Sequence, residues 1–268
     1  MMKTISPLML LVFFAGCGNP PDPDPEPPAA APLIDYTVQH VFRHDKHSYT
    51  EGFLFHQHHL FESSGAAPDQ PQTRSIVGVE DMNAGKIDTK IELDKNIYFG
   101  EGIAFFKDKL YQLTYKNQVG FIYDAKNYRL LDSFRYKNPE GWALTTDSAS
   151  LIMSDGTSTL TWLDPMTLKP VKTLAVLENN VLLDSLNELE YIKGFIYANR
   201  YLRNYIVKID PVTGRVLGRL DLEQLAENEH AKDPNVDVLN GIAYDADSDK
   251  VYVTGKLWSG IYELKFNH

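Results

Sequence analysis

Glu101 is the residue with the clearest capacity for chemistry, because it is a carboxylate with aromatic neighbours. It lies in the segment Tyr-Phe-Gly-Glu-Gly-Ile-Ala-Phe at 98–105, and we expect Phe99, Tyr115 and Trp142 to lie beside it. A carboxylate between aromatic rings loses hydration, and desolvation raises its pKa toward neutrality. A group with such a pKa accepts a proton and returns it at neutral pH. We therefore predict that Glu101 is a general acid/base.

The Glu101 segment is one of five related segments, each of which begins a short apolar strand. Their first residues are Glu51, Glu101, Gly141, Asn187 and Asn240. They recur about every 40 to 50 residues, and a second short strand follows each of them after about eight residues. A period of this length, built from short strands, is typical of propeller blades. The sequence predicts an all-β fold, a five-bladed β-propeller over residues 34–268.

The ring of blades is predicted to close through the N-terminal strand. Residues 36–42 alternate as a strand does, and they precede the first repeat. The last repeat, 239–266, has fewer residues after its second strand than the others. We predict that 36–42 crosses over to complete the last blade, since closure removes exposed sheet edges. A single helix is expected at 222–231, and Asp-Pro turns are expected at 164–167 and 210–214.

The inner strands of a propeller run along its central channel, so equivalent ends of these strands form a ring around its mouth. The repeat places five side chains on this ring, and the ends of the second strands border it. The ring residues are Glu51, Glu101, Trp142, Asn187 and Asn240, and the bordering residues are Tyr115, Tyr201 and Lys256. Carboxylates, amides, a lysine and aromatic rings together suit a small polar ligand. The repeat alone is also compatible with a purely structural role, in which Glu-Gly marks the start of a strand and takes no part in chemistry.

Two other readings of the same ring stay open. Glu51, Glu101, Asn187 and Asn240 carry oxygens that suit Ca²⁺ or Zn²⁺, as in a metal-dependent lactonase-type hydrolase. The second alternative is a non-catalytic propeller that binds peptides or sugars. The run His-Gln-His-His at 56–59 falls in an expected hairpin, and we assign no metal ligand there or elsewhere. Backbone carbonyls in the channel are also candidate ligands for a structural Ca²⁺.

The N-terminal region reads as an export signal followed by a tether. Residues 1–16 combine Lys3 with an apolar run too short to span a bilayer, which is typical of a signal peptide. Phe-Ala-Gly-Cys at 14–17 resembles the lipobox of bacterial lipoproteins, in which the cysteine is lipidated. Residues 17–33 are rich in Pro and acidic residues and are predicted to be an extended tether. We expect export and attachment to a bacterial membrane by a lipid on Cys17, on the periplasmic or outer-surface side. A plain secretory signal is the alternative.

Composition and charge limit the partners. The net charge of −10 argues against nucleic acid and anionic lipid, which both require basic protein surface. The chain has 43% apolar and 12% aromatic residues, which suits a folded core rich in strands. There is one cysteine, so no internal disulfide can form. We expect a monomer.

Several ordered motifs resemble the glutamine cyclotransferase family of plants and bacteria. The matching segments are Phe-Gly-Glu-Gly at 99–102, Leu-Tyr-Gln-Leu-Thr at 110–114, Gly-Trp-Ala-Leu-Thr at 141–145, Leu-Asn-Glu-Leu-Glu at 186–190, Leu-Asn-Gly-Ile-Ala at 239–243 and Thr-Gly-Lys-Leu-Trp at 254–258. The resemblance extends from about Tyr49 to Phe266. It implies a five-bladed propeller that converts N-terminal glutamine of peptides or proteins to pyroglutamate and releases ammonia, without a cofactor.

The resemblance also implies roles for single residues. Glu101 matches the family's proposed general acid/base. The substrate-binding positions fall on Tyr49, Glu51, Phe99, Tyr115, Trp142, Asn187, Tyr201 and Lys256. We expect the Trp142 indole N–H and the Asn187 amide to hold the substrate's amide or first peptide group. Four positions depart from the plant pattern: Tyr49 replaces Phe, Glu51 replaces Gln, and Tyr115 and Tyr201 replace Trp. Glu51 adds a second carboxylate, which pushes one pKa upward.

Overall fold

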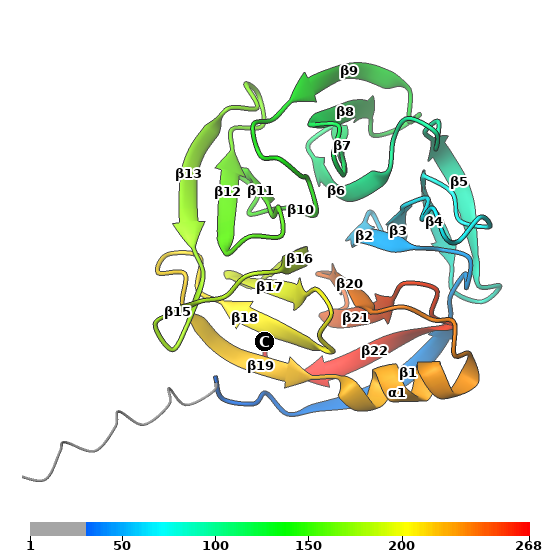
Figure 1. Ribbon diagram of the computed structural model, residues 1–268, viewed down its shortest axis with the longest axis vertical. Helices are drawn as coiled ribbons and strands as arrows, with labels where there is room; N and C mark the ends of the chain where they lie inside the picture. The colour runs from blue at the N-terminus through cyan, green and yellow to red at the C-terminus, as the bar shows by residue number, and fades with distance from the viewer. Residues whose placement is uncertain (1–30) are drawn as a thin grey trace, which may run out of the picture.

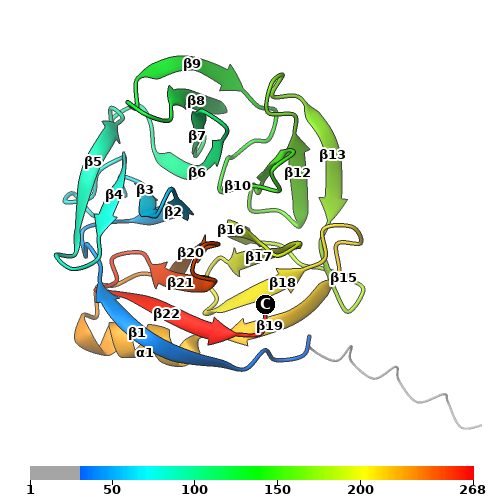
Figure 2. The same cartoon turned by 180° about the vertical axis from the view of Figure 1, so that it is seen from behind.

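The computed structural model describes residues 31–268, so the predicted signal at 1–16 and the predicted lipidation site Cys17 lie outside the described residues. Five four-stranded antiparallel sheets surround a central axis (Figures 1 and 2). Blade 1 comprises β2 (Thr50–His56), β3 (His59–Ser64), β4 (Ile76–Asp81) and β5 (Lys86–Glu92). Blade 2 comprises β6 (Gly100–Phe106), β7 (Lys109–Thr114), β8 (Val119–Asp124) and β9 (Leu130–Arg135). Blade 3 comprises β10 (Leu144–Thr146), β11 (Leu151–Met153), β12 (Thr159–Leu163) and β13 (Pro170–Ala175). Blade 4 comprises β16 (Leu186–Ile192), β17 (Phe195–Arg200), β18 (Tyr205–Ile209) and β19 (Val216–Asp221).

The fifth blade joins the two ends of the chain, which confirms the predicted closure. It comprises β20 (Leu239–Asp245), β21 (Lys250–Gly255), β22 (Gly260–Phe266) and, as its outermost strand, β1 (Tyr36–Arg43). Figure 1 shows β1 in blue beside β22 in red. The two strands are antiparallel, with Tyr36 opposite Phe266 and Arg43 opposite Gly260. This pairing covers the edge of β22 and locks the ring.

The core lies between neighbouring blades rather than in the channel. Inner and middle strands are buried on both faces, so their sequences are almost continuously apolar, whereas the outer strands β9 and β13 are largely exposed. Between blades 1 and 2, for example, Leu54, Phe61 and Val77 belong to the same cluster as Ile103 and Leu110. Because each blade buries apolar surface against two others, the starts of the inner strands are held in fixed relative positions.

The glycine after Glu101 is required by the close approach of inner strands. A Cβ at Gly102 would lie 2.4 Å from both Ala143 Cα and Leu144 N, which is too close for any side chain. Instead the Gly102 amide donates to the Trp142 carbonyl at 2.8 Å. The Glu-Gly pattern of the repeat therefore has a packing cause in addition to any chemical role.

Buried carboxyl groups on β16 connect blade 4 to blades 1 and 5. Glu188 accepts hydrogen bonds from the backbone amides of Phe53 at 3.2 Å and Ile242 at 2.8 Å. Glu190 accepts from the Tyr244 amide at 2.9 Å. Burial raises the pKa of Glu188 well above its usual range and that of Glu190 to about 8. These groups satisfy backbone donors that would otherwise be buried without partners.

The smaller sequence predictions have mixed outcomes. The predicted Asp-Pro turns are present, since Asp164 and Asp210 accept from backbone amides two and three residues later. The expected helix is α1 (Glu223–Lys232), on the outside of the ring below β22 in Figure 1. A short hairpin, β14 (Leu177–Glu178) with β15 (Val181–Leu182), was not anticipated.

The described end of the predicted tether contacts the propeller. The carbonyl of Pro32 accepts from the Arg219 amide at 2.9 Å, and the Ile34 amide donates to the Arg219 carbonyl at 2.8 Å. Residues 31–33 therefore lie along β19, with Ala31 buried and Leu33 exposed. No helix within residues 31–268 has the length and apolar character needed to cross a membrane.

Candidate active site

A cavity of about 200 Å³ opens where the inner strands begin. The nine residues that the sequence predicted for the catalytic and substrate-binding site all line it, so the structure brings the predicted set together. The lining is Tyr49, Glu51, Ala67, Pro68, Asp69, Phe99, Glu101, Tyr115, Trp142, Asn187, Tyr201 and Lys256. The nine predicted residues come from four of the inner strands or the segments just before them, and from the ends of three second strands. The roles of the nine stay predictions.

Two differences from the predicted ring are visible. Asn240 does not line the cavity, because its side-chain amide donates to the Thr50 carbonyl at 2.8 Å beneath the site. Sequence reasoning also missed Ala67, Pro68 and Asp69, which lie on the connection between β3 and β4. That connection is longer than the one between β7 and β8. Its extra length at the mouth of the channel is the signal that could have revealed it.

Glu101 is the second residue of β6 and is almost completely buried, with 4% of its surface exposed. Ser63 Oγ donates to its carbonyl at 2.6 Å, which fixes the backbone at this position. Within residues 31–268, no group donates a hydrogen bond to its carboxyl oxygens. The pKa of Glu101 lies well above its ordinary value, first because of burial and then because of the negative charges of Glu51 and Glu140, while Lys256 opposes the rise. A carboxyl group with a raised pKa is a better proton acceptor than an ordinary carboxylate, as a general acid/base requires.

Glu51 and Lys256 form a buried ion pair beside Glu101. Lys256 Nζ lies 2.6 Å from Glu51 Oε1, and both side chains are almost fully buried. Burial raises the pKa of Glu51 to about 7, and Lys256 partly opposes this effect. The ammonium also lies 4.5 Å from the centre of the Tyr49 ring, a cation–π distance. Lys256 is therefore bound to a neighbouring acid in the absence of substrate.

Aromatic rings form the walls of the cavity. Tyr49 meets Phe99 edge-on at a centroid distance of 6.2 Å, Phe99 lies 5.9 Å from Tyr115, and Trp142 lies 5.5 Å from Tyr201. The Tyr49 hydroxyl donates to Asp237 Oδ2 at 2.6 Å. Burial and this carboxylate raise the pKa of Tyr49, so the phenol stays protonated. The rings exclude water from the side of the cavity where Glu101 lies.

Two glycines make room for these walls. A Cβ at Gly65 would lie 2.2 Å from the Phe99 ring, and one at Gly156 would lie 2.5 Å from the Trp142 indole. Gly156 also has a φ of +78°, a conformation that side chains with a Cβ rarely adopt. The positions of the aromatic walls therefore depend on small residues in the connections behind them.

The Trp142 indole differs from the sequence expectation. Its Nε1–H donates to Glu140 Oε2 at 2.9 Å, so this donor already has an acceptor within the protein. The Asn187 side chain lines the cavity, is 3% exposed and has no hydrogen bond within residues 31–268. Asn187 is therefore the amide available to a substrate, and Trp142 contributes an apolar surface.

The arrangement does not favour a metal at this mouth. Lys256 places a positive charge against Glu51, which opposes a divalent cation there. The His-Gln-His-His run also fails to converge, since His56 stacks on Phe105 with centroids 3.8 Å apart and His58 is exposed beside Asp247. These histidines belong to the hairpin between β2 and β3.

Comparisons with known proteins agree with this fold. A family model described as glutamine cyclotransferase matches residues 9–266. The chain is 37% identical over 226 residues to a glutaminyl-peptide cyclotransferase of Arabidopsis thaliana, which covers 84% of this chain and 69% of the plant protein. The structure is similar to the crystal structure of Myxococcus xanthus glutaminyl cyclase, with a TM-score of 0.79, 28% identity, and 88% of this chain and 98% of that chain covered. The chain therefore belongs to the glutamine cyclotransferase family.

Proposed function

We propose that the chain is a glutaminyl-peptide cyclotransferase that converts the N-terminal glutamine of peptides or proteins to pyroglutamate. In this reaction the α-amine nitrogen attacks the side-chain amide carbon. A five-membered lactam forms, the bond to the amide nitrogen breaks, and ammonia leaves. The family assignment supports the reaction class. The single observation that carries the mechanism is the buried carboxyl of Glu101, with a raised pKa and no internal hydrogen-bond donor, at the cavity wall.

Glu101 moves the proton in this mechanism. The substrate's α-amine has an ordinary pKa of about 7.7 to 8.0 and arrives partly as an ammonium. The ammonium form first loses its extra proton to water through Glu101, and the neutral amine attacks. As the new carbon–nitrogen bond forms, the Glu101 carboxylate accepts a proton from the attacking nitrogen. The same carboxyl then delivers the proton to the departing nitrogen. One group serves both steps because its raised pKa strengthens it as a base, and the acid so formed lies beside the departing nitrogen.

The rest of the cavity supplies orientation. Asn187 offers both a donor and an acceptor to the substrate's side-chain amide or first peptide group. The negative charge shared by Glu51 and Glu101 favours a substrate that carries an α-ammonium. Tyr49, Phe99 and Tyr115 hold the glutamine side chain in a folded form. Orientation of two reacting groups within one molecule removes much of the entropic barrier.

An ammonia-release assay on a glutamine-initiated dipeptide tests the proposal, with the same dipeptide initiated by asparagine as control. We expect turnover with glutamine and none with asparagine, since the shorter side chain would close a strained four-membered ring. Turnover that disappears with a strong chelator while the chain stays folded would favour the metal-dependent hydrolase. Saturable binding of the dipeptide without ammonia release would favour the non-catalytic propeller.

We also propose that residues 1–16 direct export and that a lipid on Cys17 attaches the protein to a bacterial membrane through the segment 17–33. The support is the apolar run and the cysteine motif in the sequence. Mass spectrometry of the membrane fraction tests this, with Cys17→Ser as the control that should be released.

We expect one chain per particle, which light scattering tests. A structural Ca²⁺ bound by backbone carbonyls in the channel is also proposed, and metal analysis after dialysis tests it.

A further inference from the structure

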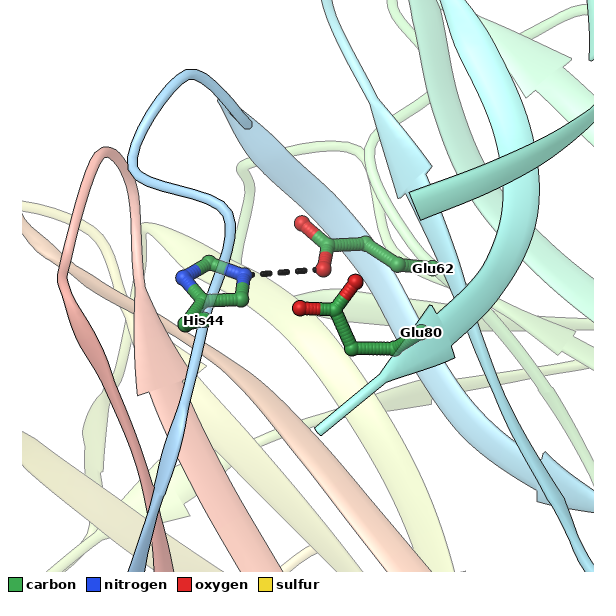
Figure 3. Close-up of side chains that lie close together, drawn as sticks. All are labelled: His44, Glu62 and Glu80. Atoms are coloured by element: carbon green, nitrogen blue, oxygen red, sulfur yellow. Dashed lines mark hydrogen bonds and ion pairs between the residues drawn. The ribbon is translucent and has the colours of Figure 1, made fainter. Parts of the chain in front are cut away.

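Three buried side chains with metal-binding chemistry converge outside the active-site cavity. His44 precedes β2, Glu62 lies in β3 and Glu80 lies in β4 (Figure 3). Each offers one ligand atom, and these three atoms lie within 4.8 Å of one another. The residues are 4%, 0% and 6% exposed, respectively. Sequence reasoning missed this group because its members are far apart along the chain and follow no motif.

The atoms that do not face the centre of the group are held by outer contacts. His44 Nδ1 lies 2.9 Å from the Trp258 carbonyl, which only accepts, so this nitrogen carries the hydrogen and Nε2 points inward. Glu62 Oε1 accepts from Thr50 Oγ1 at 2.7 Å and from Ser48 Oγ. A histidine oriented by a backbone carbonyl, with hydrogen-bonded carboxylates beside it, is the usual support around a metal ligand set.

An independent observation comes from Glu80. Its Oε1 accepts from the Asp45 amide at 3.1 Å, but its Oε2 is buried without a hydrogen-bond partner. Figure 3 shows the Glu80 carboxylate directed toward His44 and Glu62. A buried carboxylate oxygen without a partner is costly, and such an atom indicates a missing ion or donor.

We propose that His44 Nε2, Glu62 Oε2 and Glu80 Oε2 bind a divalent transition-metal ion, with Zn²⁺ as the best match to one imidazole and two carboxylates. His44 Nε2 and Glu62 Oε2 are 2.8 Å apart, a hydrogen-bond distance. The ion would displace the proton between them, and the ligands would separate slightly to reach metal distances of about 2.0 to 2.2 Å. A water molecule completes a tetrahedral set.

The site is structural rather than catalytic. Glu62 also accepts hydrogen bonds from the hydroxyls of Ser48 and Thr50. The Ser48 carbonyl in turn accepts a hydrogen bond from the Leu257 amide at 2.8 Å. The ion would therefore fix the connection between β1 and β2, which closes the ring and leads into the active-site wall. A separate depression, lined by Asp45, Ser48 and Ser64 among others, includes two residues that hydrogen-bond to the cluster.

Zinc titration of the chelator-treated full chain by calorimetry tests the site, with excess Ca²⁺ present to occupy any channel site. We expect one Zn²⁺ per chain and a higher thermal midpoint on binding. Glu80→Gln keeps the shape and the contact to the Asp45 amide, and we expect it to weaken zinc affinity about 100-fold or more. His44→Gln removes the nitrogen ligand, with the same expected loss.

Two matched variants complete the experiment. His58→Gln removes an exposed histidine paired with Asp247, and Glu101→Gln removes the carboxyl of the active site; both should bind zinc as the unmodified chain does. Unchanged zinc affinity in a folded Glu80→Gln variant would overturn the proposal. So would the absence of stoichiometric zinc binding by the unmodified chain. Ammonia release is not a readout here, so either result leaves the proposed function intact.

Discussion

Two carboxyl groups share the cavity, and their surroundings give them different tasks. Glu51 is paired with Lys256 at 2.6 Å, so its charge is largely engaged. Glu101 is buried without an internal donor, so its proton is free to move to and from a substrate. The division between a paired and an unpaired acid is typical of acid/base sites, in which environment sets the role. Two predictions follow from this contrast.

Replacement of Glu101 by Gln keeps the size of the side chain but removes the group that carries the proton. We expect kcat for ammonia release to fall about 100-fold or more, with little change in the thermal midpoint. Glu227→Gln, on the exposed side of α1, is the matched control and should keep full activity. A folded Glu101→Gln enzyme with near-normal turnover would remove Glu101 from the mechanism.

Glu51→Gln tests the electrostatic link between the two acids. The negative charge of Glu51 raises the pKa of Glu101, whereas Lys256 lowers it. The substitution removes the first effect and frees Lys256 to strengthen the second, so the Glu101 pKa should fall. Because the first step needs the carboxylate, the acid side of the kcat/KM profile should move to lower pH. An acid limb that stays in place or moves to higher pH would contradict this coupling.

At the scale of elements, the inner strands determine where the catalytic side chains lie. β6 and β10 approach so closely that Gly102 has no space for a side chain, and this contact fixes the residue before it, Glu101. The aromatic walls of the cavity depend on a contact that can adapt more easily, because Gly65 faces the Phe99 ring instead of backbone atoms. A ring can turn aside, but two strand backbones have to separate.

Gly102→Ala and Gly65→Ala therefore have different expected results. Gly102→Ala should destabilise the fold by about 1 to 3 kcal/mol through overpacking and should also lower kcat, because Glu101 shifts with the strand. Gly65→Ala should act mainly on KM, because the Phe99 wall moves. Urea unfolding together with steady-state kinetics separates the two outcomes. A Gly102→Ala variant with unchanged stability and kcat would show that β6 and β10 adapt without cost.

At the scale of the whole molecule, ring closure is the feature on which the site depends. β1 supplies the outer strand of the last blade, and the segment between β1 and β2 carries His44 and Ser48 toward the active-site wall. Loss of β1 would expose the edge of β22 and release that segment. Blades 1 and 5, which contribute Glu51 and Lys256, meet where the ring closes.

Truncation tests this dependence. A chain that begins at Ala31 keeps β1 and should retain its activity and its cooperative unfolding. A chain that begins after Arg43 lacks β1, and we expect a lower unfolding midpoint, aggregation through the exposed edge and loss of ammonia release. Denaturant unfolding and light scattering measure these effects. Equal stability of the two chains would show that closure contributes little.

The sequence alone determined the ring of blades and nine of the residues that line the cavity. Five recurrences of one strand motif specify five blades, and the short last repeat predicts the crossover of residues 36–42. Because equivalent strand positions must meet at one end of a channel, residues as distant as Glu51 and Lys256 could be assigned to one cavity. The repeated segments are similar in sequence, so comparison of the chain with itself identifies them.

The tertiary structure alone decided which partner each side chain meets. The bond from Trp142 to Glu140, the pairing of Glu51 with Lys256 and the displacement of Asn240 from the cavity all depend on distances of a few ångströms. Cluster formation by His44, Glu62 and Glu80 depends on how the N-terminal segment crosses blade 1. Repeat spacing fixes the strand on which a residue lies, but side-chain contacts between separate segments are set only when the packed ring brings them together.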